Sequence, residues 1–351
     1  MKFRITQGGF ILVATLWVIA ALSLVVAMAT SWVSESVDRT LRRRNQIETD
    51  RLLFSTQSEL LYLISTQYFS NRGLEIGNSL QARLKQMLDP MAALELGQTF
   101  IALDNRPYKL NGVTVQFQDS RGLINLNFAS QDDIYRLLGS VNVPAEDRGP
   151  LIAKLKDYME PGDLIRLNGA KTPDYLAAGK LPPSGAPLST PWEIWRVLDW
   201  DQQDALRDPS GSWFQSTSTT RSVGINLNTA PEAVLDIIQG MTPNAVKALM
   251  DYRAQTPLQN TNQAQALTGV GFTDDPLHYI MFPADSLRVT MKAKGGYNMT
   301  RTFAVSVTPQ STQGPWRIDF MIDLPSKSTN ETDQDTDIPD LPTSPLVSAG
   351  P

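Results

Sequence analysis

The residues best suited to chemistry form one acidic cluster in the middle of the chain: Asp157, Glu160, Asp163 and Asp174. Gly162 and Gly169 lie between them and permit sharp turns, which indicates a loop. Hard oxygen ligands on such a loop suit Ca²⁺, although the spacing is not that of an EF-hand. A solvated loop and a pair of catalytic carboxylates are the other interpretations of the same residues.

Composition excludes several other kinds of site. The 351 residues include no cysteine, which excludes disulfides, thiolate zinc sites and cysteine nucleophiles. The single histidine, His278, excludes a multi-histidine metal site, and no Gly-x-Ser-x-Gly elbow accompanies it. The net charge of -5 lacks the basic surplus of a nucleic-acid-binding surface. These exclusions favour a structural protein over an enzyme.

A short asparagine motif occurs twice, as Ile124-Asn125-Leu126-Asn127 and as Ile225-Asn226-Leu227-Asn228. We expect Asn127 and Asn228 to cap the helices that follow, and Asn125 and Asn226 to tie backbone groups within each turn. A ligand-binding role for these asparagines is the alternative.

The second copy of the motif continues into a segment that looks like a helix-hairpin-helix around Gly240. Its basic residues, Lys247 and Arg253, are offset by nearby acids: Glu232, Asp236 and Asp251. Binding to a DNA backbone needs a local excess of basic side chains. We therefore expect that this segment does not bind nucleic acid.

The N-terminal segment determines where the chain resides. No charged residue occurs from Ile5 to Ser34, and a helix over the 24 residues 10–33 would span roughly 36 Å, enough for a hydrocarbon core. Lys2 and Arg4 precede it, so the positive-inside rule keeps the N-terminus cytoplasmic and sends the rest outward. A cleaved secretory signal ending at Ala27-Met28-Ala29 is the alternative.

Gly8-Gly9-Phe10 separates the short basic leader from the apolar segment. A glycine without a Cβ lets a peptidase approach the bond closely, so the pattern predicts a prepilin leader, 1–9, cut after Gly9. An ordinary loop before an unprocessed anchor is the alternative. Most type IV pilins carry Glu at the fifth mature position, which here is Ala14. A subunit without that carboxylate suits the end of a filament better than its repeating body.

Periodicity places the remaining elements. Helical spacing extends from Phe10 to Tyr68, with Asn71-Arg72-Gly73 as its stop, and a further helix is expected at 79–88. Strands are expected at 99–103, 113–118, 286–293, 302–308 and 316–322, with Gly295-Gly296 as a hairpin turn. The intervening residues have a helical pattern. This order predicts an α+β fold in which a sheet domain, 34–123 and 285–324, is interrupted by an inserted all-α domain, 124–284. Residues 325–351 are expected to be a disordered acidic tail.

Taken in order over residues 1–324, these features resemble the GspK family, the large minor pseudopilins of type II secretion systems. The features that carry the resemblance are the Gly8-Gly9-Phe10 junction, Ala14 in place of Glu, Gly122–Asn127, Leu155–Tyr158, Asn168-Gly169-Ala170 before Tyr175, Ile225–Ala230 and the strand-rich end.

The resemblance implies a pseudopilin fold, with a long transmembrane helix packed on an antiparallel sheet. It also implies a place at the tip of the pseudopilus, with minor pseudopilins of the I and J types, where the subunit starts assembly and caps a filament of major pseudopilin. A prepilin peptidase would cleave after Gly9, and the amine of Phe10 would be methylated. The head would be periplasmic, anchored in the bacterial inner membrane, and could contact the secretin or secreted substrates.

Members of that family bind calcium through acidic residues, which implies Asp157, Glu160, Asp163 and Asp174 as ligands here. The sequence departs from the family at Lys171 and Thr172, where relatives commonly have acids. Two rival functions remain: a minor pilin-like component of DNA uptake or of a type IV pilus, and a membrane-anchored periplasmic enzyme that uses the acidic cluster.

Overall fold

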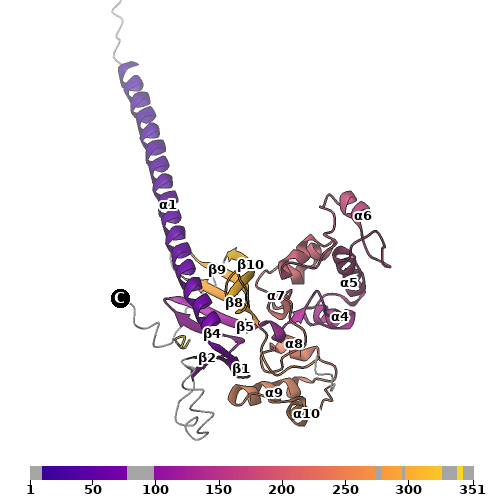
Figure 1. Cartoon of the computed structure of the whole chain (residues 1–351). Coiled ribbons are helices and arrows are strands. Elements are labelled where there is room, and N and C mark those ends of the chain that lie inside the picture. Colours follow the sequence, from indigo (N-terminus) through magenta and orange to yellow (C-terminus); the bar gives the residue numbers. More distant parts are fainter. Residues whose placement is uncertain (1–9, 77–98, 273–277, 295–296, 326–337, 343–351) are drawn as a thin grey trace, which may run out of the picture.

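The computed structural model describes residues 10–76, 99–272, 278–294, 297–325 and 338–342. The predicted leader, the helix expected at 79–88 and the Gly295-Gly296 turn lie outside the described residues. The fold class is confirmed, because a long N-terminal helix packs on an antiparallel sheet and a group of shorter helices lies beside that sheet (Figure 1).

Helix α1 runs from Phe10 to Thr66, close to the predicted limits. It contains neither glycine nor proline, and its 57 residues extend over about 86 Å. Only its C-terminal part packs on the sheet, where Leu53, Leu60 and Ile64 are fully buried.

The predicted helix stop at Asn71-Arg72-Gly73 is wrong. The helix has already ended at Thr66, and these residues form the turn between strands β1 (Tyr68–Ser70) and β2 (Gly73–Ile76). Gly73 has a φ of +132°, and a Cβ there would lie 2.1 Å from the carbonyl oxygen of Ile101. The glycine is therefore required by the close approach of strand β3 (Thr99–Ile101), which completes this small sheet.

The main sheet has five antiparallel strands in the order β10-β9-β8-β5-β4. The strands are β4 (Asp104–Leu110), β5 (Val113–Asp119), β8 (Ser286–Ala293), β9 (Met299–Val307) and β10 (Trp316–Pro325). β5 pairs directly with β8, from Val113 opposite Ala293 to Asp119 opposite Leu287. Two parts of the chain that are far apart in sequence thus form the centre of one sheet.

Strand β4 was not predicted, because Pro107 and the polar residues around it do not have a strand pattern. Its position explains why the proline is tolerated. β4 is an edge strand with a register shift between Asp104 and Pro107, and an edge position spares the hydrogen bond that a proline cannot donate.

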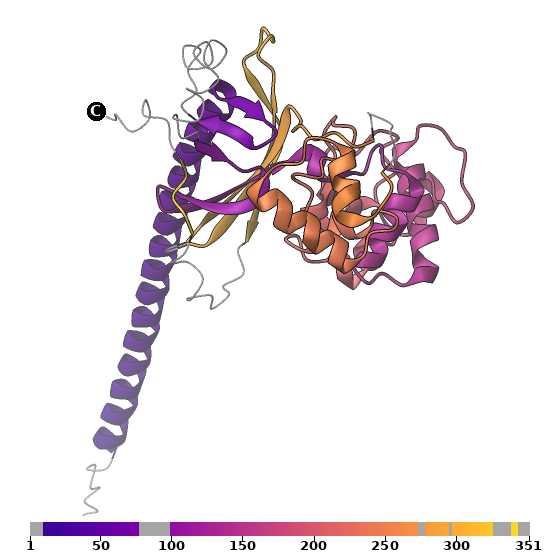
Figure 2. The same cartoon turned by 90° about the horizontal axis from the view of Figure 1, so that it is seen from below.

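Helices of the inserted part lie on the opposite side of the sheet from α1 (Figure 2). They are α4 (Gln131–Ser140), α5 (Ala145–Met159), α6 (Thr172–Ala177), α7 (Ser212–Ser216), α8 (Glu232–Asp236), α9 (Pro243–Gln255) and α10 (Thr261–Thr268). Two short strands, β6 (Ile124–Asn125) and β7 (Thr217–Ser218), pair in parallel within this part.

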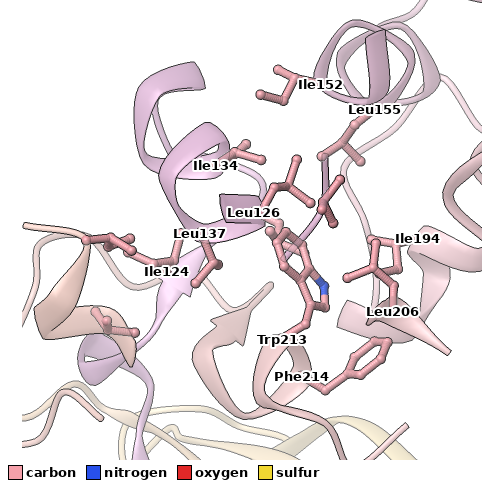
Figure 3. Close-up of a cluster of buried hydrophobic side chains, with 14 of the residues drawn as sticks. Ile124, Leu126, Ile134, Leu137, Ile152, Leu155, Ile194, Leu206, Trp213 and Phe214 are labelled. Atoms are coloured by element: carbon pink, nitrogen blue, oxygen red, sulfur yellow. The ribbon is translucent and has the colours of Figure 1, made fainter. Parts of the chain in front are cut away.

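Each side of the sheet has its own hydrophobic core. The core on the α1 side combines α1 with alternate residues of the strands, such as Val115, Val289 and Phe303. The core of the helical part is rich in aromatic residues: Trp213 lies next to Leu126, and Phe214 lies near Leu206 (Figure 3). This core also takes in Leu324 of β10, with Phe320 packed against it, so the helical part packs against the sheet as well as on itself.

The prediction of a disordered tail is wrong for residues 338–342, which return to the edge of the main sheet. The backbone N–H of Lys109 donates to the carbonyl oxygen of Pro339 at 2.9 Å, and the N–H of Leu341 donates to that of Lys109 at 2.7 Å. The Leu341 side chain is buried in the core on the α1 side. This segment thus pairs with β4 and covers an edge that would otherwise be open to another strand.

Replacing Leu341 with alanine is expected to detach this segment, because its one buried side chain and two backbone hydrogen bonds hold it. We expect the amide hydrogen of Leu341 to exchange roughly ten to thirty times faster. Hydrogen exchange measures this, with Asp340→Ala as the matched control, since Asp340 is exposed and its backbone is unchanged. Equal exchange in Leu341→Ala and wild type would contradict the role of Leu341.

Candidate functional site

The first half of α1 presents an apolar surface that no other described part of the chain covers. Trp17 and Trp32 are 74% and 72% exposed, and the leucines and valines between them are exposed as well. Among the described residues, α1 is the one helix that is long and apolar enough to cross a membrane. Apolar patches of this extent are rare on soluble monomers, so the first half of α1 is a candidate membrane anchor.

One of the two predicted processing residues, Phe10, lies at the start of this helix. Gly9 is outside the described residues, and Phe10 is the first residue of α1. Ala14 follows one turn later, with neither charge nor hydrogen-bonding group in its side chain. The small residues Ala20 and Ser23 are exposed on the same helix, where they would let a second helix approach closely.

The acidic cluster extends from the last turn of α5, through the loop, to the first turn of α6, and Asp157 is its most buried member. Asp157 is fully buried, and its Oδ1 accepts from the guanidinium of Arg166 at 2.7 Å. Its Oδ2 accepts from the backbone N–H of Arg166 at 3.0 Å. Gly169 passes so close that a Cβ there would lie 1.8 Å from Asp157 Oδ2. Both oxygens of this carboxylate are therefore engaged within the loop.

The other three predicted ligands are held separately. Glu160 forms an ion pair with Arg166, and that hydrogen bond lowers the pKa of Glu160. Asp174 accepts from the backbone N–H of Lys171 at 2.9 Å, at the start of α6. Asp163 is exposed. In the described part of the chain, no three acidic or histidine side chains lie close enough together to hold a metal ion.

A basic side chain enters this loop from the other end. Lys171 is only 4% exposed, and its Nζ donates to the carbonyl oxygens of Asp157 and Glu160, each at 2.7 Å. Both oxygens belong to the C-terminal end of α5, which is the negative end of the helix dipole. The sequence showed that Lys171 departs from the family pattern, but not that its ammonium group reaches these carbonyl groups.

Comparison with solved structures shows which known fold this chain resembles. A chain in the crystal structure of the GspK-GspI-GspJ complex from the enterotoxigenic Escherichia coli type 2 secretion system aligns over 81% of this chain and 100% of its own length, with a TM-score of 0.53 and 14% sequence identity. The chain has a GspK-like minor pseudopilin fold. No protein-family model matches the sequence, and no curated protein matches it.

The calcium binding implied by the family resemblance does not fit this version of the GspK-like fold. Three of the four predicted ligands are already bonded to Arg166 or Lys171, and the fourth, Asp163, lies apart in solvent. A calcium ion needs six to eight oxygen atoms that converge on one point. Here the carboxylates of Asp157 and Glu160 bind the guanidinium of Arg166, and the carboxylate of Asp174 accepts from a backbone N–H.

The repeated asparagines of the GspK-like fold build two equivalent turns. The Oδ1 of Asn125 accepts from the N–H of Asn127 at 3.1 Å, and that of Asn226 accepts from the N–H of Asn228 at 3.0 Å. The second asparagine of each pair then binds a distant backbone. Asn127 exchanges two hydrogen bonds with Leu188, and Asn228 exchanges two with Leu258.

The prediction that Asn127 and Asn228 cap the following helices is wrong. The N-cap of α4 is Ser130, whose side chain accepts from the N–H of Asp133, and the residue at the N-cap of α8 is Pro231. The side-chain amides of these two asparagines instead form hydrogen bonds with the backbone of Leu188 and Leu258. Each copy of the repeat therefore joins its own turn to a distant segment of the helical part by hydrogen bonds.

Sequence reasoning missed Asp119, at the joint between the sheet and the inserted part. Asp119 is fully buried, and Oδ1 accepts from the N–H groups of Arg121 at 3.0 Å and Ala284 at 2.9 Å. Oδ2 accepts from the side chains of Asn226 at 2.9 Å and Thr229 at 2.7 Å. One carboxylate thus binds the segments that enter and leave the insertion, and also its second asparagine turn.

The segment around Gly240 does not present a cationic surface. The guanidinium of Arg253 points inward and donates to the carbonyl oxygens of Leu227 and Ala230, each at 2.7 Å. Burial lowers the pKa of Arg253 to about 10. Because Arg253 holds the asparagine turn in place, only Lys247 of the two predicted basic residues is exposed for a phosphate.

Proposed function

We propose that this chain is a minor pseudopilin that ends the pseudopilus of a type II secretion system. In this proposal the chain starts assembly, caps the filament and acts with minor pseudopilins of the I and J types. Its N-terminus is cytoplasmic, residues 10–33 of α1 cross the inner membrane, and its head lies in the periplasm. The predicted leader 1–9, sheet domain, insertion 124–284 and tail 325–351 are part of the same proposal.

The observation that carries the proposal is the division of α1 into an uncovered half and a packed half. The uncovered half has no charged residue before Glu35, and the packed half forms a core with the sheet. A helix built this way can join other helices sideways in a bilayer while it holds a folded head outside. Close approach between such helices depends on small residues, which α1 offers at Ala20, Ala21 and Ser23.

The position of the helical part supports a place at the filament end. It projects from the side of the sheet opposite α1 (Figure 2), and most of the residues in its core are its own. In a regular filament every subunit is surrounded by copies, and a unit of this size would have to fit between them. A subunit at the tip has free space on one side, which suits such an insertion.

Replacing Gly9 with leucine is expected to abolish maturation. The peptidase must bind the backbone at this bond, and a branched side chain would obstruct that approach. In cells that contain a prepilin peptidase, mass spectrometry should find wild type beginning at a methylated Phe10 and the variant beginning at Met1. Ala14→Leu is the control, because it leaves the leader intact and should mature normally. A wild-type chain that retains residues 1–9 would refute the proposal.

A further inference from the structure

Two backbone carbonyl groups at the C-terminal end of α5 lack the hydrogen bonds that a continuing helix would give them. The backbone carbonyl of Asp157 would ordinarily accept a hydrogen bond from the N–H four residues later, but that residue is Pro161, which has no N–H. The carbonyl of Glu160, at the C-cap, lies just beyond the helix. Two acceptors at the negative end of a helix dipole are thus left for some cation to satisfy.

Lys171 supplies that cation. Its ammonium group lies 2.7 Å from both carbonyl oxygens and is almost fully buried. Its backbone N–H is meanwhile fixed by Asp174, so both ends of the residue are held. Arg166 supplies a second positive charge to the side chains of Asp157 and Glu160.

We infer that the Lys171 ammonium group acts as a built-in cation that replaces a divalent metal ion, so that the α5–α6 loop folds without calcium. The carboxylates and carbonyl oxygens of this loop are the kinds of group that would otherwise coordinate calcium. An ammonium group on a lysine side chain satisfies the carbonyl oxygens at every calcium concentration. The loop is then independent of the calcium content of its surroundings.

The first test is the effect of calcium on wild type. The full chain in detergent micelles is melted in excess calcium chloride and in EGTA, with tryptophan fluorescence as the signal. Four of the seven tryptophans belong to the helical part, so the signal reports mainly on it: Trp192, Trp195, Trp200 and Trp213. We expect the two midpoints to agree within about 1 °C. Calcium at a hundred times the Kd of a native site would raise the midpoint by roughly 5–10 °C, and that result would overturn the inference.

The second test removes the cation. Lys171→Met keeps the aliphatic stem but leaves both carbonyl oxygens without a donor, so in EGTA its midpoint should fall by roughly 5–10 °C. Lys180→Met is the matched control. Lys180 forms an ion pair with Asp201 that is partly exposed to solvent, so its loss should change the melting midpoint little. An unchanged midpoint for Lys171→Met would also overturn the inference.

A third variant tests whether a metal ion can bind at the position of the ammonium group. Lys171→Asp puts an acidic side chain at this position, and because that side chain is shorter than lysine it leaves room for an ion next to the two carbonyl oxygens. We expect this variant to be destabilised in EGTA and to regain several degrees in calcium chloride, although wild type does not respond. If calcium leaves Lys171→Asp unchanged, the ammonium group does not occupy a cation position and the inference fails.

Discussion

Replacing Asp119 with alanine is expected to lower the free energy of unfolding by about 3–5 kcal/mol, because four donors, three of them in buried hydrogen bonds, lose their acceptor at once. Two of these donors are the backbone N–H groups of Arg121 and Ala284, where the chain enters and leaves the insertion. The other two are side chains of the asparagine turn. The variant should therefore also loosen the helical part relative to the sheet.

Chemical denaturation of the full chain, followed by tryptophan fluorescence, measures this loss. Asp285→Ala is the matched control, since Asp285 is an exposed carboxylate at the same joint and should cost less than about 0.5 kcal/mol. Amide exchange at Ala284 should rise sharply in Asp119→Ala and stay unchanged in Asp285→Ala. A loss below about 1 kcal/mol for Asp119→Ala would show that the joint does not depend on this carboxylate.

The stability contributed by Asp119 is also expected to depend on pH. Burial raises the pKa of Asp119 above its ordinary value of 3.8, against the opposing effect of its four hydrogen bonds. Because the folded-state pKa is the higher one, the native state takes up the proton first. The stability that this group contributes therefore rises as pH falls from the raised pKa towards 3.8. The stability of wild type relative to Asp119→Asn should therefore increase in that direction, and parallel pH profiles would contradict the assignment.

The parts of the fold that could be predicted are those with a local pattern. β8 was predicted at its observed limits because Ser286–Ala293 is a short run rich in apolar and β-branched residues that ends just before Gly295-Gly296. The length of α1 followed from the absence of glycine and proline. The interrupted sheet followed from strands at both ends of a helical stretch, and the pairing of β5 with β8 gives that arrangement a physical basis.

The parts that could not be predicted depend on contacts between distant residues. Asp119 is an ordinary acid in sequence, and only folding brings Ala284 and Asn226 to it. The asparagine repeat was visible, but its partners Leu188 and Leu258 were not, so a local cap was the simplest expectation. The acidic loop was recognised as a candidate calcium site because its carboxylates are visible in the sequence. The hydrogen bonds from Lys171 to two backbone carbonyl oxygens depend on the folded path of the chain, so the sequence does not show them.

Replacing Ala14 with glutamate is expected to reduce the recovery of this chain with its partner pseudopilins by roughly 70- to 400-fold. A carboxylate in the hydrocarbon layer costs about 2.5–3.5 kcal/mol unless a partner neutralises it. Within a filament, the partner would be the N-terminal amine of an adjacent subunit. If this chain is the first subunit, no earlier subunit offers that amine, and the new carboxylate stays unpaired.

Ala14→Leu and Ala14→Gln separate charge from size at this position. Leucine is apolar and favours helix, so it should leave recovery unchanged, and glutamine, polar but neutral, should have an intermediate effect. Recovery is measured by quantitative affinity purification from membranes, after mass spectrometry has shown that each variant is cleaved after Gly9. That check separates a failure of maturation from a failure of assembly. If Ala14→Glu assembles as well as wild type, an amine does reach position 14, and the chain belongs inside the filament rather than at its tip.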